Sequence, residues 1–278
     1  MRRRSARELD LGVRSPAVGA TVPVRLLLPA RFAGEPARRW PVVYLLHGCC
    51  DTYVSWTRST DVEQLSARDD VIVAMPDGGR AGFYSDWLRG PKWETFHVVE
   101  LRQLLERAYR ADDRRAIAGL SMGGLGALAY AARHPGAFAA AASYSGLLHP
   151  RADAATMASI VDGQGEDGTA LWGDPERDAR RWAAHDPTDL ARRLRGTRLF
   201  VSSGNGRPGP LDKPGAHADP IERFVQSETL GFVRRARQLR LPARLDLYGP
   251  GTHTFPYWQR ELHRSWPMLM RALATAPG

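Results

Sequence analysis

The segment GLSMG at residues 119–123 has the residue types and spacing that most clearly indicate chemistry. An apolar run, Ala116–Leu120, precedes its serine, and an alanine-rich run, Gly124–Arg133, follows it. A serine between a strand and a helix, with a glycine two positions away on each side, is typical of a nucleophile elbow, because larger side chains would collide at so sharp a turn. The segment therefore predicts Ser121 as a nucleophile.

The same stretch also contains the spacing GLGxxA at residues 124–129, which could open a dinucleotide site. Such a site would need an acidic residue about 20 positions further on, at the end of the next strand. Residues 144–146 are Tyr-Ser-Gly instead. We therefore expect no nucleotide cofactor, and no metal either, because the sequence has no paired-cysteine metal motif.

An elbow serine needs a base, and six histidines follow residue 121. His134 ends the helix after the serine, and His263 lies in a predicted terminal helix. His253 lies in a glycine-rich segment, residues 249–253, that leaves the last predicted strand at its carboxyl end, where catalytic groups of open α/β sheets gather. We predict His253 as the base, and the alternative is an ordinary surface-loop histidine.

The acid that would orient this base has several candidates between the penultimate strand and His253, namely Asp212, Asp219, Glu222 and Glu228. Asp219 and Pro220 predict the start of a helix, as N-cap and first helical residue. Glu222 then lies in the first turn, at the carboxyl end of the preceding strand. Glu228 is about 9 Å further along the helix axis. We predict Glu222 as the acid; the alternative is a glutamate that only complements the helix terminus.

Two backbone N–H groups are predicted to form an oxyanion hole. Met122 follows the nucleophile directly, and Cys49 lies in the loop after the predicted strand Val42–Leu46, the two positions from which such donors come. A reactive thiol is the alternative role for Cys49. Because Cys49 and Cys50 are adjacent in the sequence, we expect no disulfide framework.

Short apolar runs alternate with amphipathic segments along the chain, as in parallel strands that are buried on both faces and connected by helices. Strands are predicted at Val24–Leu28, Val42–Leu46, Val71–Met75, Ala116–Leu120, Ala139–Tyr144, Leu199–Ser203 and Ala243–Tyr248, and helices at Trp93–Tyr109, Gly124–Arg133, Pro175–Ala184 and Pro220–Leu239. We predict one α/β domain over residues 1–278, a mostly parallel sheet with helices on both faces, and a helical insertion at about 147–195.

Composition excludes some classes of function. The net charge is +9, but the basic residues, all but two of them arginine, are scattered along the chain. A nucleic-acid-binding protein would concentrate them on one face or in runs, so we expect no nucleic-acid partner. We also expect no stable membrane insertion, because no stretch approaches the roughly 18–20 apolar residues of a span.

With these residues in place, the chain resembles the antigen 85 and esterase D group of α/β-hydrolases. The matching segments are VYLLHG (43–48), MPDGG (75–79), FYSDW (83–87), KWETF (92–96), GLSMGG (119–124), SGLLHP (145–150), LWGD (171–174), SGNG (203–206) and GTHTFPYW (251–258). The resemblance implies an α/β-hydrolase fold and an acyl ester substrate. It also implies Ser121 as nucleophile, His253 as base and a glutamate, aligned with Glu222, as acid.

One departure from the mycolyltransferase branch concerns the acceptor. In that branch an aspartate and an arginine beside the oxyanion loop bind trehalose, and their counterparts here are His47 and Cys50. The pair His47-Gly48 resembles esterase relatives instead. We therefore predict a serine carboxylesterase. The alternative is an acyltransferase onto a sugar or glycerol hydroxyl.

A second alternative is a non-catalytic member of the fold that binds carbohydrate or matrix protein. The presence of Ser121, Glu222 and His253 disfavours it. Candidate substrate-binding residues are His47, Cys50, Trp87, Trp172, Phe255 and Trp258. The resembling proteins are exported, whereas residues 1–13 are basic without the apolar stretch of a signal peptide, so we expect secretion by resemblance and a cytoplasmic location if the chain is full length.

Overall fold

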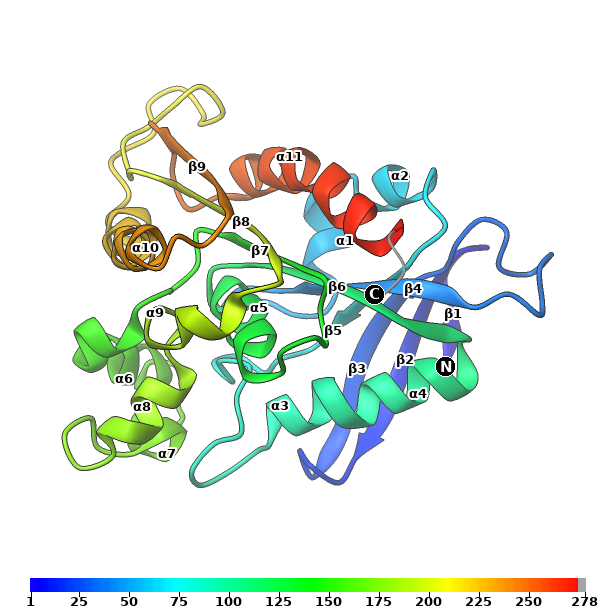
Figure 1. The fold of residues 1–278 in the computed structure, drawn as a ribbon, viewed down its shortest axis with the longest axis horizontal. Helices are drawn as coiled ribbons and strands as arrows, with labels where there is room; N and C mark the ends of the chain where they lie inside the picture. Colours follow the sequence, from blue (N-terminus) through cyan, green and yellow to red (C-terminus); the bar gives the residue numbers. More distant parts are fainter. Residues whose placement is uncertain (275–278) are drawn as a thin grey trace.

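Within the described residues, 1–274 of a computed structural model, nine strands form one sheet in the order β1-β2-β3-β5-β4-β6-β7-β8-β9 (Figure 1). The first strands pair antiparallel, as far as the β3–β5 pair, and β5, β4, β6, β7, β8 and β9 are parallel. The strands are β1 Arg2–Arg3, β2 Glu8–Ser15, β3 Ala20–Leu27, β4 Trp40–Leu46, β5 Ile72–Pro76, β6 Ala111–Leu120, β7 Ala140–Tyr144, β8 Arg198–Gly204 and β9 Ala243–Gly249. The predicted mostly parallel sheet is confirmed.

The helices cover both faces of this sheet (Figure 1). They are α1 Ser55–Ser59, α2 Val62–Ser66, α3 Trp93–Thr95, the π-helix η1 Phe96–Leu101, α4 Arg102–Ala108, α5 Met122–Arg133, α10 Pro220–Gln238 and α11 Phe255–Ala274. α4, α5 and α10 contribute to one core cluster, and α1, α2 and α11 to the other. This two-sided cover explains why the central strands are apolar at consecutive positions.

Strand β4 illustrates the reason, because all seven of its residues are buried. Val42 and Tyr44 point into the first cluster, and Val43 and Leu45 point into the second. A strand places successive side chains on opposite faces, so each face of the sheet buries its own apolar residues.

Among the described residues, the segment between β7 and β8, which includes the expected insertion at about 147–195, contains only helical elements. They are η2 Pro150–Asp153, α6 Ala154–Asp162, α7 Gly168–Trp172, α8 Ala179–His185, α9 Pro187–Leu190 and η3 Ala191–Leu194. Of these, α9 and η3 pack on α5 and α10. The assignment of residues 1–278 to one domain stays a prediction.

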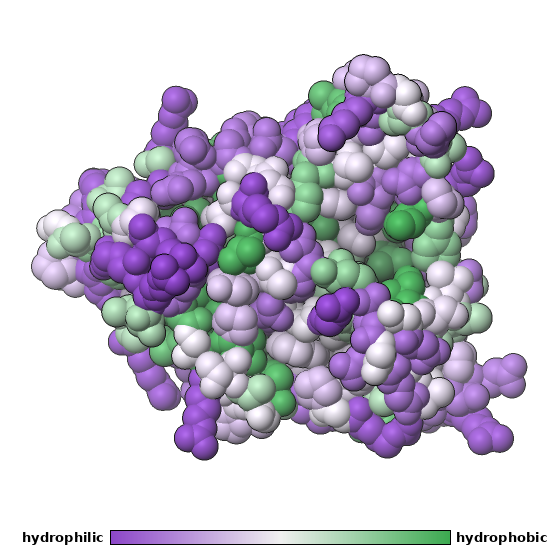
Figure 2. Space-filling view, turned by 180° about the vertical axis from the view of Figure 1, so that it is seen from behind, coloured by the Kyte–Doolittle hydropathy of each residue, from purple (hydrophilic) through white to green (hydrophobic). Residues whose placement is uncertain are grey.

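The surface seen from behind is mostly hydrophilic, with hydrophobic side chains in small separate groups (Figure 2). In the part of the chain that the structure describes, no helix is both long and apolar enough to cross a bilayer.

Candidate active site

Ser121 lies on the turn between β6 and α5, with φ 53° and ψ −121°. A positive φ at a residue other than glycine is uncommon and occurs where the surrounding structure enforces it. Here the Ser121 N–H donates to the Tyr144 carbonyl at 2.9 Å, and the Ser121 carbonyl accepts from the Gly124 N–H at 2.9 Å. The turn is therefore held from a neighbouring strand and from its own helix.

The two glycines of the GLSMG segment permit this turn by close backbone contact. A Cβ on Gly119 would lie 2.2 Å from the Gly123 carbonyl oxygen, and a Cβ on Gly123 would lie 2.4 Å from the Leu46 carbonyl oxygen. Neither glycine has a positive φ. The sequence pattern thus reflects close packing within the turn, at Gly119, and against the end of β4, at Gly123, rather than backbone freedom.

We expect Gly123→Ala to destabilise the fold by about 3 kcal/mol or more, because overpacking against backbone atoms cannot be relieved by a rotamer change. Thermal unfolding should show the melting temperature falling by about 6–12 °C for a chain of this size. Gly34→Ala is the matched control, since the nearest atom to its Cβ would be 3.8 Å away. Equal losses in the two variants would contradict this packing explanation.

His253 and Glu222 form a hydrogen-bonded pair. The Nδ1 of His253 lies 2.6 Å from Oε2 of Glu222, whose side chain is fully buried. A carboxylate at this distance holds the ring with Nδ1 protonated and leaves Nε2 free to accept a proton.

Asp219 positions both members of this pair. Its Oδ1 caps helix α10 by accepting from the N–H groups of Ile221 and Glu222, at 2.9 and 3.2 Å. Its Oδ2 accepts from the His253 N–H at 2.7 Å. The sequence proposed Asp219 as an acid candidate and as an N-cap; the structure makes it the cap that also anchors the histidine loop.

The second carboxylate oxygen of Glu222 is also satisfied. Oε1 accepts from the Ser145 hydroxyl at 2.8 Å, the Ser203 hydroxyl at 3.1 Å and the Gly204 N–H at 2.6 Å. These donors lie at the carboxyl ends of β7 and β8. A buried carboxylate is stable only when it is hydrogen-bonded or paired, and both oxygens of Glu222 are hydrogen-bonded.

The other acid candidates lie elsewhere. Glu228 is buried and accepts from the His149 N–H through Oε2 at 3.3 Å, and its Oε1 has no hydrogen-bond partner within residues 1–274. Asp212 accepts from the Thr252 hydroxyl and, at 2.8 Å, from the Tyr257 hydroxyl. Within residues 1–274 neither side chain bonds to His253, and Glu222 alone of the four candidates pairs with that ring.

The pH dependence of stability should report on Glu228, because burial raises its pKa to about 8. Between pH 4.5 and 8 the folded chain then keeps a proton that the unfolded chain has lost, so stability falls as pH rises through this window. Glu228→Gln removes the contribution of Glu228 to this dependence. We expect its melting temperature to exceed that of the parent by at least about 3 °C at pH 9, with little difference at pH 5. An equal difference at both values would contradict the buried neutral carboxyl.

Ser121 and His253 lie at the junction of two cavities. The larger, about 530 Å³, opens between α6 and α10, and its apolar wall consists of Phe83, Leu147, Ile160, Ile221, Phe224 and Val225. The smaller, about 340 Å³, includes Asp51, Phe255 and Trp258. Within residues 1–274 no hydrogen bond joins the Ser121 hydroxyl to the His253 ring; in hydrolases without substrate this contact is often long and shortens when substrate binds.

The N–H groups of Met122 and Cys49 are free, since neither has an acceptor among the residues that the structure describes. Met122 is the first residue of α5, where a helix leaves its N–H groups unpaired. Cys49 lines both cavities beside Ser121. Both predicted oxyanion donors therefore have hydrogens available, Met122 directly after the serine and Cys49 in the wall of the cavities that Ser121 also lines.

His47 does not reach either cavity. Its buried ring accepts from the Gly78 N–H through Nε2 at 2.9 Å, and its Nδ1 donates to the Gly48 carbonyl at 2.7 Å. Burial lowers the pKa of His47, in keeping with this neutral ring. Contact with substrate is not supported: His47 fixes the loop that carries Cys49.

The structure also places two of the candidate tryptophans outside both cavities. Trp87 donates to the Gly82 carbonyl at 3.0 Å. Trp172 is fully buried, donates to the Ser85 hydroxyl at 3.0 Å and stacks on His185 with centroids 5.2 Å apart. Both rings belong to the protein interior, and their indole N–H groups have hydrogen-bond acceptors there, as buried tryptophans usually do.

The remaining candidates do line the site. Cys50 borders the larger cavity, while Phe255 and Trp258 border the smaller. The Trp258 ring meets the His253 ring edge-on at 4.9 Å, and its indole N–H donates to the Ser145 hydroxyl at 3.2 Å. Trp258 thus packs against the base and against a hydrogen-bond partner of Glu222.

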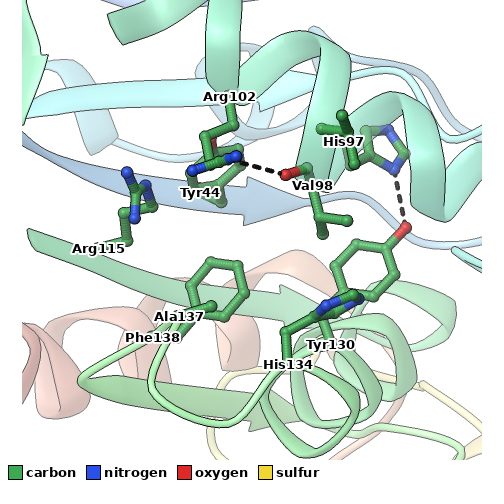
Figure 3. A pocket seen from close by; sticks show the side chains of 10 residues that line it. Tyr44, His97, Val98, Arg102, Arg115, Tyr130, His134, Ala137 and Phe138 are labelled. Carbon is green, nitrogen blue, oxygen red and sulfur yellow. Dashed lines mark hydrogen bonds between the residues drawn. The ribbon is translucent and has the colours of Figure 1, made fainter. Parts of the chain in front are cut away.

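A separate cavity of about 300 Å³ lies between η1, α4 and α5 (Figure 3). Figure 3 shows Arg102 donating to the Val98 carbonyl and His97 paired with the Tyr130 hydroxyl, at 3.1 and 2.9 Å. This separate cavity is lined by none of the residues Ser121, Glu222 and His253. Over residues 1–274 no group of three or more His, Cys, Asp or Glu side chains could hold a metal ion.

Comparison with known proteins gives the family. The Esterase family model matches residues 15–269. The chain belongs to this esterase family. The predicted resemblance to the antigen 85 and esterase D group and the predicted α/β-hydrolase fold are confirmed by this family match and by similar proteins.

Three relatives show the range of the family. The chain is 37% identical over 210 residues to an esterase of Mycobacterium tuberculosis, Esterase Rv1288, covering 70% of this chain and 45% of the relative. It is 33% identical over 257 residues to the diacylglycerol acyltransferase/mycolyltransferase Ag85B of Mycobacterium intracellulare, covering 86% and 77%. The crystal structure of Mycobacterium tuberculosis MPT51 (FbpC1) superposes with a TM-score of 0.80 at 27% identity, covering 97% and 100%.

Proposed function

We propose that this esterase-family chain hydrolyses acyl esters through an acyl-serine intermediate. Ser121 is the nucleophile, His253 the base, Glu222 the acid, and the N–H groups of Met122 and Cys49 are the oxyanion donors. The observation that carries the proposal is the buried Glu222–His253 pair, at 2.6 Å, facing the same cavities as the elbow serine.

In the first half-reaction, Nε2 of His253 takes the Ser121 proton while Oγ forms a bond to the ester carbonyl carbon. The N–H groups of Met122 and Cys49 stabilise the resulting oxyanion. Glu222 stays ionised and stabilises the imidazolium. His253 then protonates the departing alcohol as the carbon–oxygen bond breaks.

In the second half-reaction, water replaces the alcohol. His253 takes a proton from water, the hydroxide attacks the acyl carbonyl, and the acid leaves as Ser121 regains its proton. We place the acyl group in the larger cavity, because its wall between α6 and α10 is apolar. The alcohol then occupies the smaller cavity, which contains the polar residues Asp51 and Thr254.

Acyl transfer to a sugar or glycerol hydroxyl is the second candidate, and the 33% sequence identity to the acyltransferase Ag85B favours it. Both reactions share the acyl-serine and differ only in which hydroxyl attacks it. Against transfer stands the orientation of His47, whose ring bonds to Gly78 and offers no acceptor contact.

Product identification decides between the two. A series of p-nitrophenyl esters, from acetate to palmitate, is incubated with the protein alone and with added glycerol or trehalose, and products are identified by mass spectrometry. We expect the free acid as the main product in every mixture. A predominance of acylated glycerol or trehalose would establish the transferase instead.

A further inference from the structure

Cys49 and Cys50 are the two cysteines of the chain, and both are free thiols. Their sulfur atoms lie 2.7 Å apart. Successive side chains of an extended segment point to opposite faces, but Cys50 has φ 66°, and this left-handed conformation turns both sulfurs to one side. The Cys50 N–H donates to the Arg80 carbonyl at 2.8 Å, which holds the turn.

The two thiols are accessible from the active-site cleft. Both line the larger cavity together with Ser121 and His253. Cys50 is exposed and Cys49 is half-buried. A ligand held by both sulfurs would therefore lie at the entrance of the cavity that we assign to the acyl group.

The number of nearby ligands limits what can bind. Thiolate sulfur selects soft ions, but structural zinc needs four protein ligands and catalytic zinc three. Throughout residues 1–274 there is no group of three or more His, Cys, Asp or Glu that could hold a metal ion. A suitable ligand must accept two sulfurs and bring its own third substituent.

We propose that Cys49 and Cys50 form a vicinal dithiol site for monosubstituted trivalent arsenicals, and that its occupation closes the acyl cavity. A trivalent arsenic with one carbon substituent satisfies this requirement, because two arsenic–sulfur bonds complete its valence. The binding half of the proposal stands on the thiols alone, and the closing half rests on the proposed function.

The binding step balances without an oxidant or reductant. With an arylarsine oxide, two arsenic–sulfur bonds form while two S–H bonds and the arsenic–oxygen double bond break. Both protons go to the oxide oxygen, which leaves as water, and arsenic stays trivalent. Burial raises the pKa of the Cys49 thiol, so the exposed Cys50 reacts first and Cys49 closes the ring.

Phenylarsine oxide tests the binding half directly, because no other cysteine in the chain can react. We expect intact-mass spectrometry to show one phenylarsenic group per chain and thiol titration to show both thiols lost. Added 2,3-dimercaptopropanol should restore both thiols. An adduct that leaves one thiol titratable, or a native protein with no free thiol before reduction, would overturn the dithiol site.

Single substitutions test whether both sulfurs bind one arsenic. Cys50→Ser and Cys49→Ser each leave a monothiol, and losing the second, intramolecular bond should weaken binding by about 10²-fold or more. Thr156→Ser, which lines the same cavity and keeps both thiols, should bind as the parent does. Circular dichroism verifies folding of each variant. Parent-like affinity in either cysteine variant would overturn the proposal.

Hydrolysis of a p-nitrophenyl ester tests the closing half. We expect activity to fall in proportion to bound arsenic and to return with dimercaptopropanol. Full activity in the stoichiometric adduct would overturn closure and leave the binding site intact. A parent that is inactive before arsenical is added would instead refute the proposed function, and the mass and thiol measurements would still decide the binding half.

Discussion

Ser121→Ala is expected to reduce kcat/KM for p-nitrophenyl esters by at least about 10⁴-fold, to the background rate. The proposed nucleophile is lost, and the GLSMG segment has no second hydroxyl residue to replace it. The change should not unfold the protein, because no hydrogen bond of the Ser121 hydroxyl is present within residues 1–274. Alanine also has a Cβ like serine, so the strain of the left-handed backbone at φ 53° is the same in both proteins. Initial rates and a thermal melt of the same sample measure both effects.

A fluorophosphonate probe supplies the control, because only an activated serine reacts with it. Ser159 lines the same cavity as Ser121, so Ser159→Ala is the matched variant and should still be labelled. Ser121→Ala should not be labelled. Labelling of Ser121→Ala at the parent rate would move the nucleophile to another residue.

Glu222→Gln is expected to reduce kcat by about 10³–10⁴-fold with KM little changed. The donors from Ser145, Ser203 and Gly204 fix an acceptor at the Oε1 position. The amide oxygen of glutamine must therefore lie there, which turns its NH₂ group toward Nδ1 of His253. The ring then carries its proton on Nε2, the wrong tautomer for a base.

Glu228→Gln is the comparison for this variant, since Glu228 is also a buried glutamate of α10 and does not contact His253. We expect its kcat to stay within about threefold of the parent at pH 7, within the range of substitutions far from the reacting atoms. Steady-state kinetics of both variants at several pH values gives the ranking. A larger loss in Glu228→Gln than in Glu222→Gln would transfer the role of acid to Glu228.

Most of the framework could be predicted because local burial appears directly in the sequence. The predicted strands at 42–46 and 116–120 correspond to β4 and β6, whose consecutive apolar residues reflect helices on both faces. The antiparallel β2, Glu8–Ser15, was missed, although its alternating apolar residues pair with β3. The predicted helix at 93–109 is helical from Trp93 to Ala108 but contains the π-helix Phe96–Leu101 in its middle, which periodicity does not reveal.

Side-chain orientation could not be predicted in the same way. His47, Trp87 and Trp172 belong to segments that resemble the family. Their rings nevertheless form hydrogen bonds with interior groups and do not line the two active-site cavities. Ser145 and Ser203 bind Glu222 and were not predicted to do so. The signal that could have identified them is their position at the carboxyl ends of two adjacent parallel strands.

The sequence by itself determined the parallel strands of the sheet, the serine turn with its two glycines, and a histidine after the last strand. Only the tertiary structure decided which carboxylate pairs with His253, and that Asp219 bonds to a backbone N–H 34 residues away. The physical reason is the distance along the sequence over which each interaction acts. Periodicity and turn chemistry depend on neighbours within a few residues, whereas the pairing of Glu222 with His253 depends on how the ends of β7, β8 and β9 meet.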